Sequence, residues 1–279
     1  MIVVTGATGN VGRTLVAELA AAGERVTAVS RRPSDAPRQP GVRHHSADLT
    51  APESLLPALE GADALYLLVA GAGDGTDPGA ILDAAKRAGV RRVVLQSSQL
   101  AGTRPRSASH DHLREFEAAV RESGAEWTVL RPAGFATNAF AWVPGVREQR
   151  TVAAPFGDVG LPVVDPADIA AVAARVLRGA GHTGRTYELT GPAPVTPREQ
   201  ARAIGEALGE PVRFAQLTRD EARAVLSRFM PDVVVEGTLS VLGEPSEAER
   251  RVSPDTERVL GRAPGSFAAW AARNREVFA

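Results

Sequence analysis

Short apolar runs and longer amphipathic stretches alternate along the first half of the chain. The short runs are rich in β-branched residues and predict strands, whereas the stretches between them carry apolar residues at helical spacing. Strands are predicted over Ile2–Thr5, Arg25–Val29, Val42–His45, Ala64–Val69, Arg92–Gln96 and Trp127–Leu130, and helices near Val11–Ala22, Pro52–Glu60, Pro78–Ala88 and Ser109–Ser123. This alternation is typical of βαβ units around a parallel sheet.

Glycines support the predicted helix ends. A glycine follows each of the four helices, at Gly23, Gly61, Gly89 and Gly124. Because glycine adopts the left-handed C-cap conformation without a Cβ penalty, these positions agree with the ends that periodicity indicates.

Beyond Pro132 proline and glycine interrupt the chain more often. A helix is predicted over Asp168–Arg178, a strand over Thr186–Thr190, and further helices near Pro197–Leu208, Arg219–Phe229 and Ser266–Val277. We therefore expect a smaller, mostly helical region after the sheet.

Length and composition indicate a globular protein. The chain has 279 residues, of which 44% are hydrophobic and 23% charged, and a domain takes roughly 150 residues. The 32 Lys and Arg residues and 33 Asp and Glu residues give a net charge of -1. Neither nucleic acid nor an anionic membrane surface is therefore an expected partner.

The residue types and the apolar runs also indicate whether to expect disulfides, metal sites, a membrane span or a secreted protein. Cysteine is absent, and no His, Asp and Glu set has metal-ligand spacing, so we expect no disulfide and no metal. The most apolar run, Ala64–Gly73, is about half of the ~20 residues that cross a bilayer. A strand predicted from Ile2 leaves no room for a signal peptide, and we expect a cytoplasmic protein.

A glycine-rich loop joins the first predicted strand to the first helix. Its sequence is Gly6-Ala7-Thr8-Gly9-Asn10-Val11-Gly12. In this position backbone N–H groups and the positive end of the helix face an anion, and the glycines leave room for a pyrophosphate. The residues predicted to hold a dinucleotide here are Gly6, Thr8, Gly9, Asn10, Val11 and Gly12.

The spacing of this loop, G-x-x-G-x-x-G, also indicates a family. Together with Trp127–Pro132, Val164–Ala170 and Arg262–Phe267, it resembles the NmrA-like atypical short-chain dehydrogenase/reductases, especially their type 2 quinone-oxidoreductase-like branch. The likeness covers essentially the whole chain. It implies a Rossmann domain that binds NADP(H) and a substrate cleft roofed by the C-terminal segment.

The expected fold class is therefore α/β, a Rossmann-type doubly wound parallel sheet with a smaller, mostly helical C-terminal substrate-cap region. We expect residues 1–132 to form the NADP(H)-binding domain, with a helix and a strand contributed by 156–190. Residues 133–155 and 191–279 are expected to form the substrate cap.

The end of the second predicted strand indicates the choice of cofactor. NAD enzymes place an acidic residue there for the ribose hydroxyls, whereas this chain has Ser30-Arg31-Arg32. We expect Arg31 and Arg32 to bind the 2′-phosphate of NADP(H), with solvated surface charges as the alternative. The resemblance assigns Asp48 and Leu49 to the adenine, and helix capping is the alternative for Asp48.

Ends of the remaining strands should face the nicotinamide half, because open α/β sheets bind ligands at their carboxyl edge. The candidates are Val69, Ala70 and Gly71 after the fourth strand, Ser97 and Ser98 after the fifth, and Phe135 and Asn138 after the sixth. The last pair is assigned by the resemblance, and core packing is the alternative for Phe135.

The usual proton donor of the superfamily is missing. Standard members use a tyrosine whose pKa is lowered by a lysine one helical turn later, in a Tyr-x-x-x-Lys pair. The only tyrosines here, Tyr66 and Tyr187, are followed at that spacing by alanine and glycine, and the only lysine is Lys86. The sequence cannot supply the pair.

Other residues are candidates for the missing acid. His110 and Arg114 reproduce the spacing of the pair near the start of the Ser109–Ser123 helix. An imidazole titrates near neutral pH, so His110 or His112 is a candidate acid, with solvated histidines as the alternative. Ser98 is the third candidate for a catalytic role.

Two kinds of function fit these residues. The first is an NADPH-dependent reductase that transfers hydride to a quinone or a related electron-poor conjugated carbonyl, whose product anion is stabilised by resonance and can be protonated by water. A tailoring enzyme for an aromatic metabolite would share this mechanism. The second is a non-catalytic NADP(H) sensor. We predict the reductase, with a small aromatic or quinone-like substrate, and leave the oligomeric state open.

Such a substrate would need an apolar pocket. The aromatic and methionine side chains that the region after Pro132 offers for it are Phe135, Phe140, Trp142, Phe156, Phe214, Phe229 and Met230. Core packing is the alternative for most of them.

Overall fold

A parallel sheet organises the part of the chain that the structure describes. The computed structural model describes residues 1–32, 39–69 and 75–279. Within them the main sheet has seven strands in the order β3-β2-β1-β4-β5-β6-β8. They are β1 (Ile2–Val4), β2 (Val26–Ser30), β3 (Val42–Ser46), β4 (Ala64–Leu68), β5 (Arg92–Gln96), β6 (Glu126–Pro132) and β8 (Arg185–Leu189). The chain starts in the middle and builds outward on both sides, which confirms the doubly wound fold.

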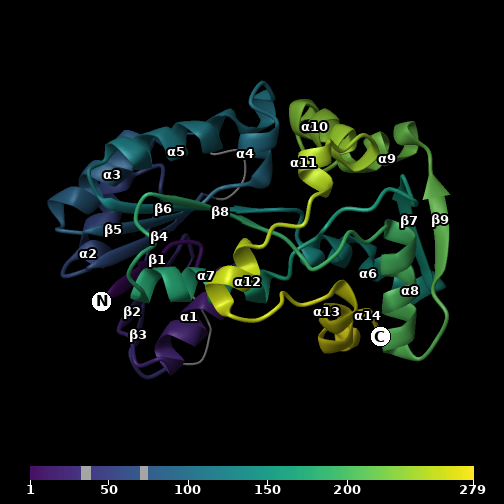
Figure 1. The fold of residues 1–279 in the computed structure, drawn as a ribbon, viewed down its shortest axis with the longest axis horizontal. Coiled ribbons are helices and arrows are strands. Elements are labelled where there is room, and N and C mark those ends of the chain that lie inside the picture. Colours follow the sequence, from purple (N-terminus) through teal and green to yellow (C-terminus); the bar gives the residue numbers. More distant parts are fainter. Residues whose placement is uncertain (33–38, 70–74) are drawn as a thin grey trace.

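Helices cover both faces of this sheet (Figure 1). On one face α1 (Gly12–Ala21) and α7 (Pro166–Arg178) bury their apolar residues in a single cluster with the strands. On the other face α3 (Pro78–Arg87) and α5 (Asp111–Glu122) do the same, together with the short α2 (Leu56–Leu59). The four glycines predicted to end helices all have positive φ, from 70° to 84°.

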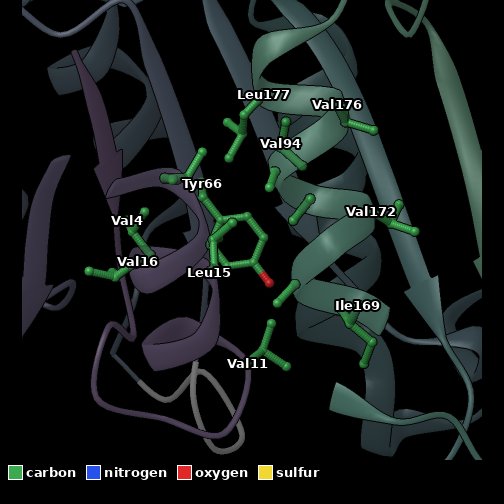
Figure 2. Close-up of a cluster of buried hydrophobic side chains, with 14 of the residues drawn as sticks. Val4, Val11, Leu15, Val16, Tyr66, Val94, Ile169, Val172, Val176 and Leu177 are labelled. Atoms are coloured by element: carbon green, nitrogen blue, oxygen red, sulfur yellow. The ribbon is translucent and has the colours of Figure 1, made fainter. Parts of the chain in front are cut away.

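The first buried cluster is centred on Tyr66 of β4 (Figure 2). Its ring is fully buried and lies between Leu15 of α1 and Ile169 of α7. The Tyr66 hydroxyl donates a hydrogen bond to the buried Gln96 side chain, so its polar group is satisfied. Each fully buried aliphatic side chain in this cluster stabilises the fold by about 1.5–3 kcal/mol.

Beyond the main sheet the chain forms a further apolar cluster, separate from the two on the faces of the main sheet, and it includes a small sheet. Strands β7 (Thr151–Pro155) and β9 (Arg213–Leu217) pair in parallel. The helices around them are α6 (Val143–Gln149), α8 (Pro197–Leu208), α13 (Phe267–Arg273) and α14 (Arg275–Phe278), after the 3-10 segment η3 (Ala136–Trp142). The prediction of a mostly helical region missed this pair of strands, because neither has a long β-branched run.

Residues 218–250 form a separate helical unit, which we call the α9–α11 unit. It contains α9 (Arg219–Leu226), α10 (Asp232–Gly243) and α11 (Glu247–Arg250). It lies beside α4 (Gln99–Thr103) and the 3-10 turn η2 (Ala108–His110) of the first half (Figure 1). The predicted helix over Arg219–Phe229 is too long, since α9 ends at Leu226, and α10 was not predicted because Val233–Val235 is β-branched.

Two other predicted helices are interrupted. Pro52–Glu60 divides into a 3-10 turn, Pro52–Leu55, and α2, because Pro57 lacks the N–H that a continuous helix would use. The terminal helix near Ser266–Val277 divides into α13 and α14 at Asn274.

The C-terminal segment docks on the start of α7 through two buried aspartates. Asp168 accepts a 2.6 Å hydrogen bond from the Gly265 N–H and pairs with Arg262 at 2.8 Å. Asp165 caps α7 and pairs with Arg273. These bonds, together with α12 (Asp255–Leu260), which contacts α7 and β8, connect the end of the chain to the main sheet.

Over the described ranges, none of the helices combines the length and the apolar character that crossing a lipid bilayer requires.

Candidate functional site

The glycine loop forms a close turn between β1 and α1. Gly6 has φ of +63°, and a Cβ there would lie 2.5 Å from the Leu68 side chain. A Cβ at Gly12 would overlap the Gly6 carbonyl oxygen and lie 2.8 Å from Ala7 Cα. These glycines therefore let the first turn of α1 approach the loop, which presents backbone N–H groups at the carboxyl edge of the sheet.

The side chains of this glycine loop differ in their exposure to solvent. Thr8 and Asn10 are exposed, whereas Val11 is buried in the core and can offer only its backbone. The Asn10 Nδ2 donates a 3.3 Å hydrogen bond to Thr137 Oγ1 in η3, and Asn10 Oδ1 accepts one of 2.8 Å from Arg13. The glycine loop thus contacts the segment that follows β6, a contact that sequence reasoning missed.

Arg31 and Arg32 follow β2 with exposed side chains. The hydroxyls of two strand-terminal serines hold their backbone: Ser30 donates to the Arg32 carbonyl at 2.6 Å and Ser46 donates to the Arg31 carbonyl at 3.2 Å. The two guanidinium groups are therefore carried by an anchored backbone beside the loop, where they can bind an anion such as a 2′-phosphate.

Asp48 and Leu49 follow β3 at the same edge. The Asp48 side chain is exposed, and its Oδ1 accepts a 3.0 Å hydrogen bond from the Thr50 N–H, which holds the pKa of Asp48 below its usual value. Leu49 and Val69 are half-buried and pack against the second core cluster. Two further candidates, Ala70 and Gly71, lie outside the described residues.

Ser97 and Ser98 end β5, and each hydroxyl has a defined partner. Ser97 donates a 2.6 Å hydrogen bond to Glu117 Oε1, and Ser98 Oγ accepts from the Leu100 N–H at 3.2 Å as the N-cap of α4. Because its proton is directed at Glu117, Ser97 can only accept a hydrogen bond from a ligand in this arrangement.

Glu117 is the centre of a buried charge network that sequence reasoning missed. Its carboxylate, 1% exposed, also accepts two hydrogen bonds from Arg131 of β6, at 2.9 and 2.7 Å, and one from Arg121 at 2.7 Å. Burial alone would raise the pKa of Glu117, but these bonds hold it below its usual value. An acidic residue on the apolar face of α5, between Phe116 and Val120, was the signal for it.

The histidine candidates lie at the start of α5. His110 precedes that helix, in η2, so His110 and Arg114 do not form a pair on one α-helix face. His110 Nδ1 is hydrogen-bonded to Ser109 Oγ at 2.8 Å, and burial together with nearby positive charge lowers the pKa of His110 to about 4. Arg114 instead bonds the carbonyls of Arg104 and Ser107. His112 is half-buried in the first turn of α5.

Neither tyrosine is placed to act as an acid. Burial raises the pKa of Tyr66 far above its usual value. The hydroxyl of Tyr187, on the edge strand β8, lies 2.8 Å from His182 Nδ1. Lys86 lies in the last turn of α3, on the opposite side of the sheet from the Tyr66 ring.

Phe135 and Asn138 continue from β6 into η3. Phe135 is half-buried and packs against the first core cluster, and the following Ala136 N–H donates to the Val164 carbonyl at 2.9 Å. Asn138 is exposed. The Phe135 ring therefore has the packing role that was the alternative for it, and the exposed Asn138 stays available to a ligand.

Most of the aromatic side chains after β6 that were candidates for a substrate pocket pack in the core or are exposed. Phe140 packs on Trp270 and Phe278 with ring centroids 5.1 and 6.0 Å apart. Phe214 lies under the Arg198 guanidinium, and Phe229 is 80% exposed. The expectation of an aromatic-lined pocket thus receives little support from these rings.

Comparisons with known proteins agree with the geometry of the glycine loop. Residues 6–179, more than half of the chain, match the family described as NAD(P)H-binding. The chain belongs to the NAD(P)H-binding family. It is 39% identical over 285 residues to (4-alkanoyl-5-oxo-2,5-dihydrofuran-3-yl)methyl phosphate reductase of Streptomyces griseus, across 100% of this chain and 99% of that one.

Two further members of this group of reductases are similar over their whole length. NAD(P)H azoreductase of Xenophilus azovorans is 30% identical over 285 residues, across 100% of this chain and 99% of the azoreductase. The structure of the NADPH-dependent quinone oxidoreductase QOR2 of Escherichia coli, complexed with NADPH, aligns with a TM-score of 0.82 and 27% identity, across 98% and 99% of the two chains.

Within the NAD(P)H-binding family, this chain is an NADP-dependent oxidoreductase related to quinone oxidoreductase and azoreductase. The relatives favour turnover over the sensor alternative. The described residues also fit the cofactor, since the loop has no room for a Cβ at Gly6 or Gly12 and two arginines lie beside it.

Proposed function

We propose that this protein reduces electron-poor conjugated carbonyl compounds, quinones among them, by hydride transfer from NADPH without a tyrosine acid. The single observation that supports this most is the bonding of the two hydroxyls at the carboxyl edge: Ser97 donates its hydrogen bond to Glu117, and Ser98 caps α4. Such an edge favours acceptors that need little help with the proton.

The chemistry of the acceptor follows from this. A simple ketone becomes a localised alkoxide on hydride addition and needs an acid, which usually accelerates such a step by roughly a hundredfold or more. A quinone or a doubly activated alkene becomes a delocalised anion that water can protonate. The 39% identical relative is named for a substrate whose ring double bond, at C3 and C4, is conjugated with both the 5-oxo and the 4-alkanoyl carbonyl.

We assign the dinucleotide to the carboxyl edge of the sheet, on 1–132 with 156–190. The glycine loop and the N-terminus of α1 would hold the pyrophosphate, and Arg31 and Arg32 the 2′-phosphate. Asp48 and Leu49 would face the adenine, while Val69, Ser97 and Asn138 would border the nicotinamide half. NADPH supplies the hydride when bound. Residues 133–155 and 191–279 would cover the acceptor.

The proton is best assigned to solvent. At neutral pH His110 is uncharged, because its pKa is lowered to about 4, and its Nδ1 is hydrogen-bonded to Ser109. It is therefore a poor general acid. Replacing His110 by Ala should leave kcat for a quinone within about threefold of the natural value, because water, and not His110, protonates the product anion.

The test is NADPH oxidation, followed by absorbance, with four acceptors: 1,4-benzoquinone, a 2-acylbutenolide, an azo dye and a saturated ketone. We expect reduction of the quinone and the butenolide and none of the ketone. Reduction of the ketone at a similar rate would contradict the absence of an acid. Tight NADPH binding with no reduction of any acceptor would favour the sensor.

A further inference from the structure

The α9–α11 unit is attached to the first half of the chain mainly by polar contacts. Its own apolar cluster is small and consists of Ala222, Val235 and Leu239, with Phe156 and Leu226 packed against it. On one side the unit packs on Phe156 and α9 contacts β7 and β9. Toward α4 and η2, where this apolar cluster does not extend, its position depends on hydrogen bonds and ion pairs.

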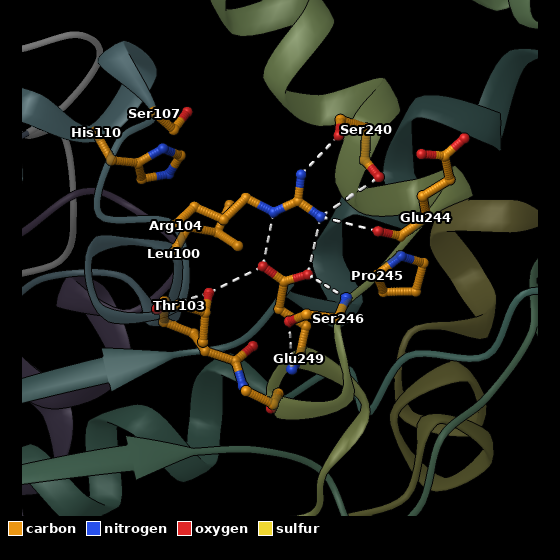
Figure 3. A network of polar contacts seen from close by, with 12 residues as sticks. Leu100, Thr103, Arg104, Ser107, His110, Ser240, Glu244, Pro245, Ser246 and Glu249 are labelled. Atoms are coloured by element: carbon orange, nitrogen blue, oxygen red, sulfur yellow. Dashed lines mark hydrogen bonds and ion pairs between the residues drawn. The ribbon is translucent and has the colours of Figure 1, made fainter.

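Arg104, directly after α4, makes most of those bonds (Figure 3). Its guanidinium donates to both carboxylate oxygens of Glu249 in α11, at 2.8 and 2.9 Å. It also donates to the Ser240 hydroxyl at 2.6 Å and to the Glu244 carbonyl at 3.1 Å, at the end of α10. One side chain of the first half therefore holds both α10 and α11.

Glu249 is built to receive this arginine. Its side chain is 1% exposed, and it accepts further hydrogen bonds from Thr103 Oγ1 at 2.9 Å and from the Ser246 N–H at 2.8 Å. A buried carboxylate with a bidentate arginine and two more donors is a specific, directional joint, because a shift of the unit would leave buried charge without its partner.

The other end of α4 lies at the carboxyl edge of the sheet. α4 is five residues long, and its N-cap is Ser98. In its first turn the buried Gln99 donates to the Ala248 carbonyl of α11 at 3.3 Å. The same short helix thus connects the strand end that would face the nicotinamide with the unit held by Arg104.

α10 also closes over the turn that precedes α5. A Cβ on Gly237 would lie 2.9 Å from Ser109 Oγ, so the helix and the turn are in direct contact there. Ser109 in turn bonds Ser107 and His110, at 2.8 Å each. The unit is therefore seated against α4 and η2, the two elements that follow β5.

We propose that Arg104, through Glu249, is a positioning residue that fixes the α9–α11 unit as the outer wall of the acceptor site, and that this position sets how large an acceptor the enzyme reduces. The inference rests on the proposed function, which places the acceptor beside Ser97 and Ser98. An acceptor larger than the nicotinamide ring would extend from that edge toward α4 and the unit, whereas a single-ring acceptor would need no contact with it.

The kinetic test uses Arg104→Ala and the milder Arg104→Lys and Glu249→Gln, with NADPH and two acceptors, 1,4-benzoquinone and a two-ring azo dye. We expect KM for the dye to rise about tenfold, while kcat for benzoquinone and Kd for NADPH stay within about twofold. Arg104→Lys should show a smaller rise, because lysine keeps the charge and loses the bidentate bond. An equal loss for both acceptors and for NADPH binding would overturn the proposal.

The matched control is Arg87→Ala, which removes an exposed pair of 2.6 Å with Glu53, between the end of α3 and the 3-10 turn Pro52–Leu55. This variant should change neither KM nor kcat for either acceptor. Limited trypsin digestion tests the joint without any turnover: cleavage after Arg228, at the α9–α10 turn, should be faster in Arg104→Ala than in Arg87→Ala. An unchanged rate of cleavage would overturn the proposal that Arg104 holds the α9–α11 unit in place. Faster cleavage in a protein that reduces no acceptor would reject the proposed function and keep the joint.

Discussion

Ser97, at the carboxyl end of β5, donates a 2.6 Å hydrogen bond to Glu117, whose carboxylate is buried on α5. Arg131 on the neighbouring β6 holds the same carboxylate through two further bonds. The ends of two adjacent strands are thereby fixed to one helix by a single buried charge. The order of the carboxyl edge, on which the cofactor would lie, depends on this charge.

Replacing Glu117 by Gln should lower the free energy of unfolding by about 3 kcal/mol, because the half-buried Arg131 would lose the charged partner that accepts two of its hydrogen bonds. Urea denaturation measures this value. The control is Glu53→Gln, where an exposed pair is broken and a change below about 1 kcal/mol is expected. Equal changes in the two variants would show that the Glu117 network contributes no more than a surface pair.

Replacing both Arg31 and Arg32 by Ala should raise Kd for NADPH by about 10- to 100-fold, because the 2′-phosphate loses charge-assisted hydrogen bonds. Kd for NADH, which lacks this phosphate, should change by no more than about twofold. Calorimetric titration of both nucleotides checks the result, and Arg87→Ala serves as the control. A similar loss of affinity for NADH would contradict the assignment of Arg31 and Arg32 to the 2′-phosphate.

The parts of the fold that were predicted correctly depend on local signals. Alternating apolar runs and amphipathic stretches indicate strands and helices wherever one face is buried, and Gly23 and Gly89 show the positive φ expected at helix ends. The glycine loop was recognisable because Gly6 and Gly12 are needed by backbone contacts within the loop and with Leu68. Such features are encoded within a few residues.

What was missed depends on contacts between distant residues. Glu117 and Arg131 are 14 positions apart, and Arg104 and Glu249 are 145 apart. In the sequence each is one of many charged residues, and most charged residues are solvated. Only the packing of α4, α5 and α11 shows that these carboxylates are buried. The burial of His110 and its bond to Ser109 likewise follow from the tertiary fold, and they could not be predicted from the sequence.

The Glu249 joint should make stability depend on pH. Burial alone would raise the pKa of Glu249, but hydrogen bonds from Arg104, the Ser246 N–H and Thr103 bring it to about 2, below its ordinary value of 4.5. The contribution, about 3 kcal/mol, should be fully present above pH 4.5 and be lost as the pH falls toward 2. Urea denaturation at several pH values from about 5 to about 3 should show that the free energy of unfolding depends less steeply on pH in Glu249→Gln than in the natural chain. Identical slopes would contradict a depressed pKa.

Two alanine substitutions in the glycine loop should separate packing from ligand binding. In Gly12→Ala the new Cβ would meet the Gly6 carbonyl and Ala7 Cα, at 2.8 Å for the latter, so α1 must shift and the unfolding midpoint should fall. In Gly9→Ala the Cβ would meet only the Gly6 carbonyl, at 3.2 Å, on the exposed side of the loop. The fold should tolerate it, while Kd for NADPH rises by at least about tenfold because the methyl group occupies the approach of the pyrophosphate. Thermal unfolding and fluorescence titration of both variants distinguish these effects, and normal NADPH affinity in Gly9→Ala would mean that the phosphates lie elsewhere.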